Sequence, residues 1–144
     1  MSIRINATLT ITQWQGQRFL QRLPRILNAY GQALDTQLRE EISVSQFAWP
    51  RTTRRRSGQV VSSPRDIVDT GAFLRSQTLS RQGPLTARFV WDPTGPGGFQ
   101  YARTIFTGYV TNNGTVVPGR DWIRPALIHQ PAVPFFAQQW RNTR

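Results

Sequence analysis

The clearest pattern at the start of the chain is a strict alternation of apolar and polar residues. The apolar members are Ile3, Ile5, Ala7, Leu9 and Ile11, and Arg, Asn or Thr residues stand between them. A period of two is typical of a strand that buries one face. The alternation therefore predicts an N-terminal strand, paired in the main sheet and available as an edge, with Ile3, Ile5, Leu9 and Ile11 facing a helix.

A long amphipathic helix is predicted next, from about Gln17 or Pro24 to about Ser43. Both starting points stay open, because proline fits the first turn of a helix but bends or ends its interior. Gly31 lowers the helix propensity by about 1 kcal/mol relative to alanine. The apolar residues recur at three- and four-residue steps, and they are Leu23, Ile26, Leu27, Tyr30, Leu34, Leu38 and Ile42. Such a stripe is typical of a core-facing helix, and its leucines are the ones expected to cover the N-terminal strand.

Residues 64–79 are interpreted as a hinge, in which a helical turn leads into a strand. An aspartate or threonine just before a short apolar run is a typical helix start, so Asp69 is expected to cap the helix and to contribute about 1 kcal/mol. An ordinary capped turn is the simpler interpretation. The hinge residues singled out are Asp69, Thr70, Gly71, Leu74 and Arg75. After Ser76 the residues alternate, which predicts a hairpin over 77–92 with its turn at Gly83.

The C-terminal third predicts short helices around one further hairpin. Apolar residues recur at helical spacing over 99–109, where Gly108 is a plausible C-terminal cap. Asn113-Gly114 favours a tight turn between strands at 109–111 and 115–117. Asp121 is expected to cap the next helix, Pro131 interrupts it, and the tail over 131–144 is expected to hold a last helix.

These elements predict one α+β domain over residues 1–144. We expect a mixed or antiparallel β-sheet packed against one long amphipathic helix, with short helices at the C-terminal end. A chain of 144 residues can bury a core without disulfides.

Charge is the most informative feature of the composition. All 18 basic residues are arginine, against 7 acidic residues, so the net charge is +11. Arg51, Arg54, Arg55 and Arg56 stand close together in residues 51–63, a segment without periodicity that is predicted to be a flexible loop. The loop is either simply solvated or in contact with DNA or an acidic protein. Arginine suits both partners, because its guanidinium binds phosphate and carboxylate bidentately.

The sequence gives little support for catalysis, cofactors or membrane insertion. There is no cysteine and only one histidine, which argues against a metal site. Asp121 and His129 lack the nucleophile elbow and the oxyanion loop of a hydrolase. No apolar run reaches the roughly 18 residues of a membrane span, and the alternating N-terminal residues are unlike a signal peptide. We therefore expect a non-enzymatic protein that needs no cofactor.

Four motifs in order carry a resemblance to a known family. They are the helix ending in Phe47-Ala48-Trp49-Pro50-Arg51, the hinge at 69–76, the Tyr101-Ala102 helix that runs into Gly108, and the segment 118–127 with Arg120, Trp122 and Pro125. Together these motifs resemble the tail-completion proteins of long-tailed bacteriophages, a family of minor tail and head–tail joining proteins that is similar to tail terminators. The resemblance covers roughly residues 15–130, and Trp122 stands where the family commonly has phenylalanine.

The resemblance implies a virion protein that is assembled in the host cytoplasm and located at the head–tail junction. Such proteins form a ring, expected here to have six subunits, that caps the tail tube and joins it to the head connector around the DNA channel. The implied partners are copies of the chain, the connector and tail tube proteins, and DNA through nonspecific contacts. Tyr101, Gly108, Arg120, Trp122 and Pro125 would then serve in the core or between subunits. Tail terminator, tail-completion protein and other neck subunit all remain possible positions.

The main alternative is a small basic module that binds nucleic acid for another purpose. A protein that reads sequence is expected to gather its base-reading residues on one exposed helix. Here the arginines are spread along the chain, which favours assembly. A capsid-surface or tail-tube subunit would keep the structural role and change the location.

Overall fold

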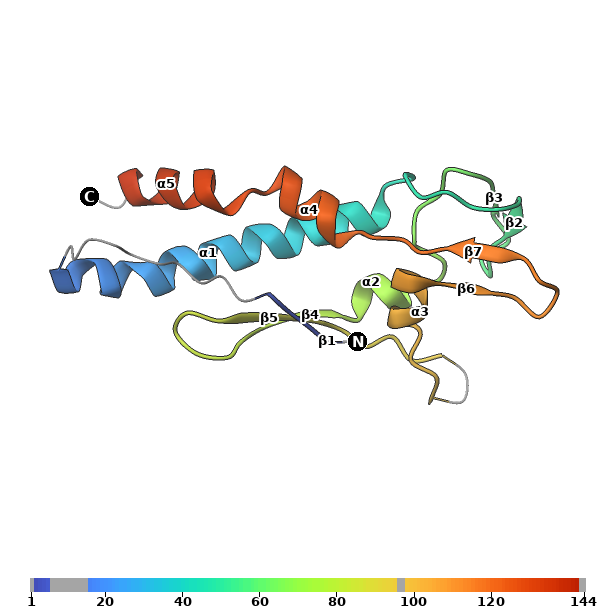
Figure 1. The fold of residues 1–144 in the computed structure, drawn as a ribbon, viewed down its shortest axis with the longest axis horizontal. Helices are drawn as coiled ribbons and strands as arrows, with labels where there is room; N and C mark the ends of the chain where they lie inside the picture. Colours follow the sequence, from blue (N-terminus) through green and yellow to red (C-terminus); the bar gives the residue numbers. More distant parts are fainter. Residues whose placement is uncertain (1, 6–15, 96–97, 143–144) are drawn as a thin grey trace.

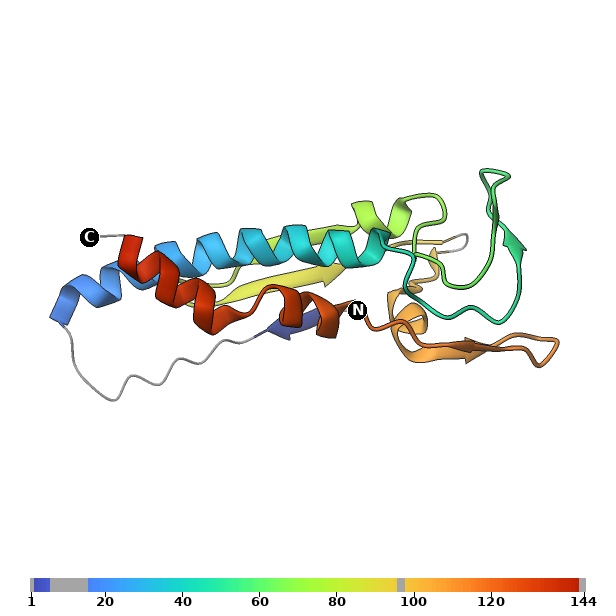
Figure 2. The ribbon, with the colours of Figure 1, turned by 90° about the horizontal axis from the view of Figure 1, so that it is seen from above.

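The computed structural model describes residues 2–5, 16–95 and 98–142, and its centre is one helix, α1 (Gly16–Ser43). At about 1.5 Å per residue its 28 residues extend over roughly 42 Å. Helices α4 (Ile123–His129) and α5 (Ala132–Asn142) contact one side of α1, and strands β4 (Gln77–Arg81) and β5 (Ala87–Trp91) contact the other. Figures 1 and 2 show the resulting elongated body, which confirms the predicted α+β class.

The main sheet is antiparallel and has the order β1-β5-β4. Strand β1 (Ser2–Ile5) pairs with β5 from Ser2 opposite Val90, and β4 pairs with β5 from Gln77 opposite Trp91. An N-terminal strand at a sheet edge is thus confirmed for residues 2–5. Ala7, Leu9 and Ile11 lie outside the described residues, as does the direction of the side chains of Ile3 and Ile5.

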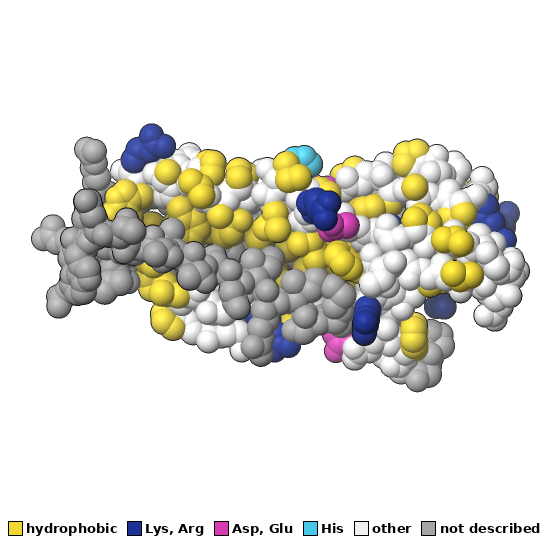
Figure 3. Space-filling view, in the orientation of Figure 1, with side chains coloured by type: hydrophobic (Ala, Val, Ile, Leu, Met, Phe, Trp, Pro, Cys, Tyr) yellow, Lys and Arg dark blue, Asp and Glu magenta, His cyan; other side chains and the backbone are white. Residues whose placement is uncertain are grey.

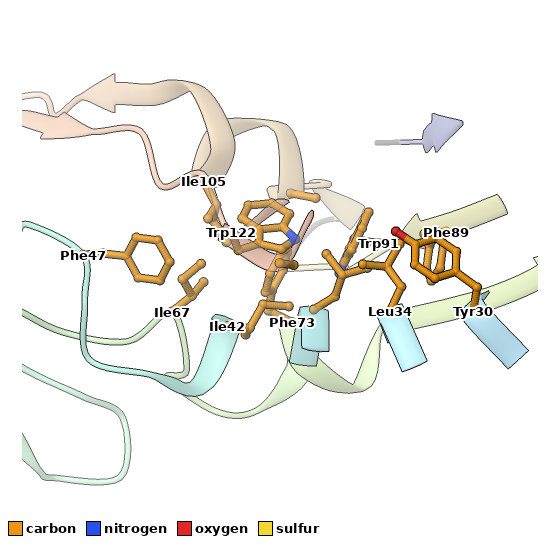
Figure 4. Close-up of a cluster of buried hydrophobic side chains, with 13 residues drawn as sticks. Tyr30, Leu34, Ile42, Phe47, Ile67, Phe73, Phe89, Trp91, Ile105 and Trp122 are labelled. Carbon is orange, nitrogen blue, oxygen red and sulfur yellow. The ribbon is translucent and has the colours of Figure 1, made fainter. Parts of the chain in front are cut away.

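The core follows the apolar stripe of α1, and all seven predicted stripe residues are buried. Figure 4 shows the cluster running from Tyr30 along the helix to Ile42 and continuing beyond the helix end to Ile67 and Phe47. Its centre is Trp122, which is fully buried. Rings of Phe73, Trp91 and Phe106 meet it edge-on, at centroid distances of 5.0, 5.5 and 5.5 Å. This geometry is favourable for aromatic quadrupoles.

A polar network fixes the angle between α1 and the hinge. Helix α2 (Ala72–Arg75) leads directly into β4, as predicted. Arg39 of α1 donates to the carbonyls of Leu74 and Gln77 at 3.1 and 2.9 Å, and the Gln77 amide donates to Asp35. The buried Gln77 also accepts from the indole of Trp91 at 3.1 Å. Because each of these groups has a partner, the network can stay buried without a large desolvation cost.

Beyond the end of α1, two small hairpins and a helix form the other half of the molecule. They are β2 (Thr53–Arg54) with β3 (Val60–Val61), α3 (Ala102–Thr107), and β6 (Gly108–Val110) with β7 (Val116–Pro118). Figures 1 and 2 both show the hairpins at the end of the molecule away from α5. The predicted hairpin at 109–117 is confirmed, and so is Gly108 as the C-terminal cap of α3, with φ of 80°.

The C-terminal helices return along α1 as two pieces. Asp121 accepts hydrogen bonds from the backbone N–H groups of Ile123 and Arg124, both at 3.0 Å, which confirms it as the cap of α4. The helical conformation is interrupted between α4 and α5 at Pro131. Tyr30 stabilises the junction between α4 and α5, because its hydroxyl donates to the carbonyl oxygen of Gln130 at 3.0 Å. Its ring also packs against Phe135 and Phe136.

Two sequence-based predictions need correction. Of the two proposed starts for α1, the one at Pro24 is wrong, because the helix begins at Gly16 and continues through the proline. Asp69 does not cap α2, whose N-terminal cap is Gly71 in the left-handed region. The Thr70 hydroxyl lies 3.4 Å from the Ala72 nitrogen, and the Asp69 carboxylate instead accepts from the backbone N–H of Arg56.

Two glycines make opposite predictions about stability. Gly31 faces the sheet, yet a Cβ there would lie 3.6 Å from Leu79, which is ordinary contact. Gly31→Ala should therefore raise the free energy of unfolding by about 0.5–1 kcal/mol through helix propensity.

Gly108 is the opposite case, because a Cβ there would lie 2.6 Å from backbone atoms and the residue has a φ of 80°. Gly108→Ala should cost at least about 2 kcal/mol. Urea unfolding checks both, and destabilisation by Gly31→Ala would contradict this packing of α1 on the sheet.

Candidate functional site

A cleft of about 490 Å³ opens between the β2–β3 hairpin, α3 and the β6–β7 hairpin. Five arginines and one aspartate line it, together with several aromatic side chains. The arginines come from two distant parts of the chain, Arg54, Arg55, Arg56 and Arg65 from one and Arg120 from the other. The site is therefore a strongly basic cleft with aromatic walls, and we call it the arginine cleft.

A short backbone bridge places Arg65 and Trp49 at the cleft. Phe47 and Arg65 exchange two backbone hydrogen bonds of 2.9 Å, so the two segments that flank the β2–β3 hairpin are joined. The guanidinium of Arg65 lies over the ring of Trp49 at 4.3 Å, a cation–π distance, and donates to the Thr53 hydroxyl at 3.0 Å. Burial lowers the pKa of Arg65, and the nearby charge of Arg55 adds to this effect.

Arg120 reaches the same ring from the opposite half of the chain. Its backbone N–H donates to the carbonyl of Ile105 at 3.0 Å, and its guanidinium carbon lies 4.7 Å from the centre of the Trp49 ring. Gly119 makes this possible, since a Cβ there would lie 2.4 Å from the carbonyl oxygen of Phe106. The two segments thus pack backbone against backbone, and the side chain of Arg120, the next residue, is directed into the cleft.

Arg120 is a buried cation without a carboxylate partner. The residue is 6% exposed, and its Nε has no hydrogen-bond partner in the described part of the chain. Among the described residues, no ion pair or side-chain hydrogen bond of its guanidinium is present. Burial lowers the pKa of Arg120 to about 10, and the charge of Arg65 acts in the same direction. Since the group is still charged at neutral pH, the fold contains a desolvated positive charge, which is costly unless a partner compensates it.

Residues 51–63, predicted as a flexible loop, contain the short β2–β3 hairpin and several defined contacts. Arg55 forms an ion pair with Asp66, and both side chains are largely buried. Arg55 also accepts a backbone bond from Gly58 and donates one to Gln59. The charge of Arg55 is therefore balanced by a carboxylate of the same chain. Arg51, Arg54 and Arg56 are exposed.

The structure brings together part of the predicted site. Arg54, Arg55, Arg56, Asp69, Thr70, Tyr101 and Arg120 all line the arginine cleft, whereas Arg51 does not. Arg75 packs its guanidinium against Gly71 and donates to the carbonyl of Thr70 at 3.1 Å. Leu74, which packs against the core cluster, and the fully buried Trp122 have core roles. Pro125 lies in the first half of α4 and is half-buried.

Among the cleft residues that sequence reasoning did not assign to the site, Trp49 and Arg65 are central to its geometry. The sequence analysis includes Trp49 only within the Phe47-Ala48-Trp49-Pro50-Arg51 motif and does not single out Arg65. The available signal was the Trp49-Pro50 pair at the end of a helix, since an aromatic residue there has to find a packing partner. The partner itself depends on the bridge between Phe47 and Arg65, which no local pattern indicates.

The arrangement is suited to binding an anion. Within the described residues there is no cluster of His, Asp or Glu side chains that could hold a metal ion. Asp69 is the one acidic residue of the lining, and it is engaged with the backbone of Arg56. In a membrane context, none of the described helices has the length and apolarity needed to cross a bilayer.

The ion pair between Arg55 and Asp66 predicts a difference between two neighbouring aspartates. Asp66→Ala leaves the enclosed Arg55 unpaired and removes an acceptor for the Val68 N–H, so it should cost about 3 kcal/mol. Asp69→Ala removes an exposed contact and should cost less than about 1 kcal/mol. Urea unfolding of the two variants makes the comparison, and equal losses would show that the pair does not hold the hairpin.

Comparison with protein-family models, with curated proteins and with solved structures gives no match for this chain. The resemblance to phage tail-completion proteins consequently rests on the four sequence motifs alone.

Proposed function

We propose that the chain is a structural subunit of a ring at the head–tail junction of a tailed bacteriophage. In this role it caps the tail tube and joins it to the head connector around the DNA channel. The proposed location rests on the ordered sequence motifs. The observation that best supports ring formation is that the isolated chain exposes two different apolar surfaces on separate elements.

The first surface is one face of the β6–β7 hairpin. Val110 and Val116 are directly opposite each other in the antiparallel register, so their side chains share a face. They are 64% and 65% exposed, whereas Val117 on the other face is buried. A two-stranded ribbon with an apolar outer face is unfavourable in water, and covering that face with another subunit removes the cost.

The second surface lies on α4 and α5. Ile128 and Val133 are 66% and 79% exposed, and Leu127 beside them is partly exposed. Figure 3 shows hydrophobic side chains gathered over the two C-terminal helices, on the upper side of this view. Both helices contact α1, and these three side chains stay exposed, so they lie on a part of the helical layer that α1 does not cover.

Two unlike surfaces on one chain favour a heterologous contact. When the hairpin of one subunit binds the helices of the next, each copy keeps one free surface of each kind, and repetition closes a ring if the rotation allows it. A symmetric dimer would instead require a surface that binds its own copy. The hairpin and the helices are different in shape, which fits the ring better.

The charge of the chain also fits the proposed location. A ring multiplies the net charge of +11 around its axis, and such charges repel one another unless anions are near. DNA in the channel would supply phosphates through weak, salt-dependent contacts. The same charge keeps the alternative open, that of a small basic module for nucleic acid, which the exposed Arg51, Arg54 and Arg56 favour.

Cysteine cross-linking tests the heterologous contact, since the natural chain has no cysteine. With a short bis-maleimide, the double variant Val116→Cys/Ile128→Cys should give a ladder of covalent oligomers. A mixture of the two single variants should stop at the dimer, because each copy then carries one half of the contact.

The matched control pairs Val116→Cys with Leu85→Cys, which places the second thiol on an exposed residue of the β4–β5 turn. This pair should remain monomeric on denaturing gels. Equal cross-linking of both pairs, or none in either, would contradict the proposed interface.

Deletion of the gene tests the proposed location. In the phage, loss of the gene should leave finished heads and tails unjoined, and normal virions without the protein would refute the location.

A further inference from the structure

We propose that the arginine cleft is a receptor for an acidic segment of another protein, whose carboxylate pairs with Arg120 at the floor of the cleft. The proposal goes beyond ring formation and holds whether or not the chain forms a ring. It depends on the cleft, on the buried guanidinium without a partner, and on the walls that limit what can enter.

The first step of the argument is that the cleft is incomplete as it stands. Arg65 and Arg120 both lie over Trp49, and the Nε atoms of both arginines are buried without an acceptor. Buried side-chain donors usually have a partner. Around this cleft the Nε of Arg55 and the indole N–H of Trp49 lack one as well within the described residues, and such a group of exceptions calls for an explanation. An anion bound in the cleft would compensate the buried charge of these guanidinium groups.

The second step concerns the chemistry of the missing acceptor. A guanidinium binds a carboxylate through two parallel hydrogen bonds, and the pair is strongest where water is excluded. Within the chain, the nearby carboxylates are already engaged, Asp66 with Arg55 and Asp69 with the backbone of Arg56. Since no described carboxylate is paired with Arg120, we expect the acceptor to come from another molecule.

The third step separates a protein ligand from DNA. Arg120 is 6% exposed at the floor of a cleft of about 490 Å³, a volume typical of sites for small groups. A glutamate or aspartate side chain can extend into such a site, whereas duplex phosphates lie on a convex cylinder and reach only the rim. Base stacking on Trp49 is disfavoured, since two guanidinium groups already lie over its ring.

The rim adds features that suit an extended acidic peptide. Arg54 and Arg56 are exposed beside the opening and can attract further carboxylates. Phe99 also lines the cleft and is 61% exposed, so it offers an apolar contact for a neighbouring side chain of the ligand. A segment that combines acidic residues with an apolar one thus fits both the floor and the rim.

The test is fluorescence anisotropy with the full chain and a short labelled peptide of Asp, Glu and Gly with one Phe. The parent should bind this peptide, more tightly at low salt, and should not bind the matched peptide with Asn and Gln in place of the acids. Arg120→Met should weaken binding by at least about tenfold, as expected for losing a hydrogen-bonded charge pair. Arg124→Met is the matched control, since Arg124 carries the same charge on an exposed side chain and should change binding less than about twofold.

Thermal unfolding of the same variants separates binding from folding. Arg120→Met should be as stable as the parent or more stable, because an apolar side chain of similar size replaces an unpaired buried cation. If Arg120→Met fails to fold, peptide binding is measured instead with Arg54→Ser, a variant at the exposed rim, which should bind the peptide severalfold more weakly. Unchanged binding in the foldable variants, absence of peptide binding, or tighter binding of duplex DNA than of the peptide would each overturn the proposal.

Discussion

The close approach of two backbones at Gly108 and Gly119 is the constraint on which the distal half of the molecule depends. A Cβ at either glycine would lie within 2.6 Å of backbone atoms of the other segment, so the base of the β6–β7 hairpin packs against the end of α3 without side chains between them. This contact also determines the positions of Arg120 and Trp122, which come just after Gly119 in the sequence. Arg120 enters the arginine cleft, and Trp122 enters the core between the rings of Phe73, Trp91 and Phe106.

The two halves of the molecule are stabilised in different ways. Along α1, the core is apolar and the buried Gln77 is paired with Arg39 and Asp35, while among the described residues the indole N–H of the buried Trp122 has no acceptor. At the hairpin end, cations are buried next to one another, and the Nε atoms of Arg65 and Arg120 lack acceptors. Evolution for stability alone would replace such groups with apolar ones. Their presence in a cleft argues that this end is built for contact with something acidic, whereas the other end holds the fold.

Much of the fold could be predicted because its signals are local. The stripe from Leu23 to Ile42, the hairpin around Asn113-Gly114 and the cap at Asp121 each depend on residues within a few positions of one another. The cleft could not be predicted, because its members meet only through tertiary contacts. Arg65 is placed by its bridge to Phe47, and Arg120 reaches Trp49 from 71 positions along the chain. For the same reason Asp69 was expected to act on its own helix, although the hairpin carrying Arg56 lies closer to its carboxylate.

We propose that this chain assembles through unlike apolar surfaces on β6–β7 and on α4–α5 that meet in neighbouring copies. The most direct measurement is native mass spectrometry of the purified protein over a range of concentrations, with negative-stain imaging of the same sample. We expect one closed oligomer of defined mass, seen as rings with a central opening. A monomer at every concentration, or a series of open-ended oligomers without a preferred size, would contradict this account.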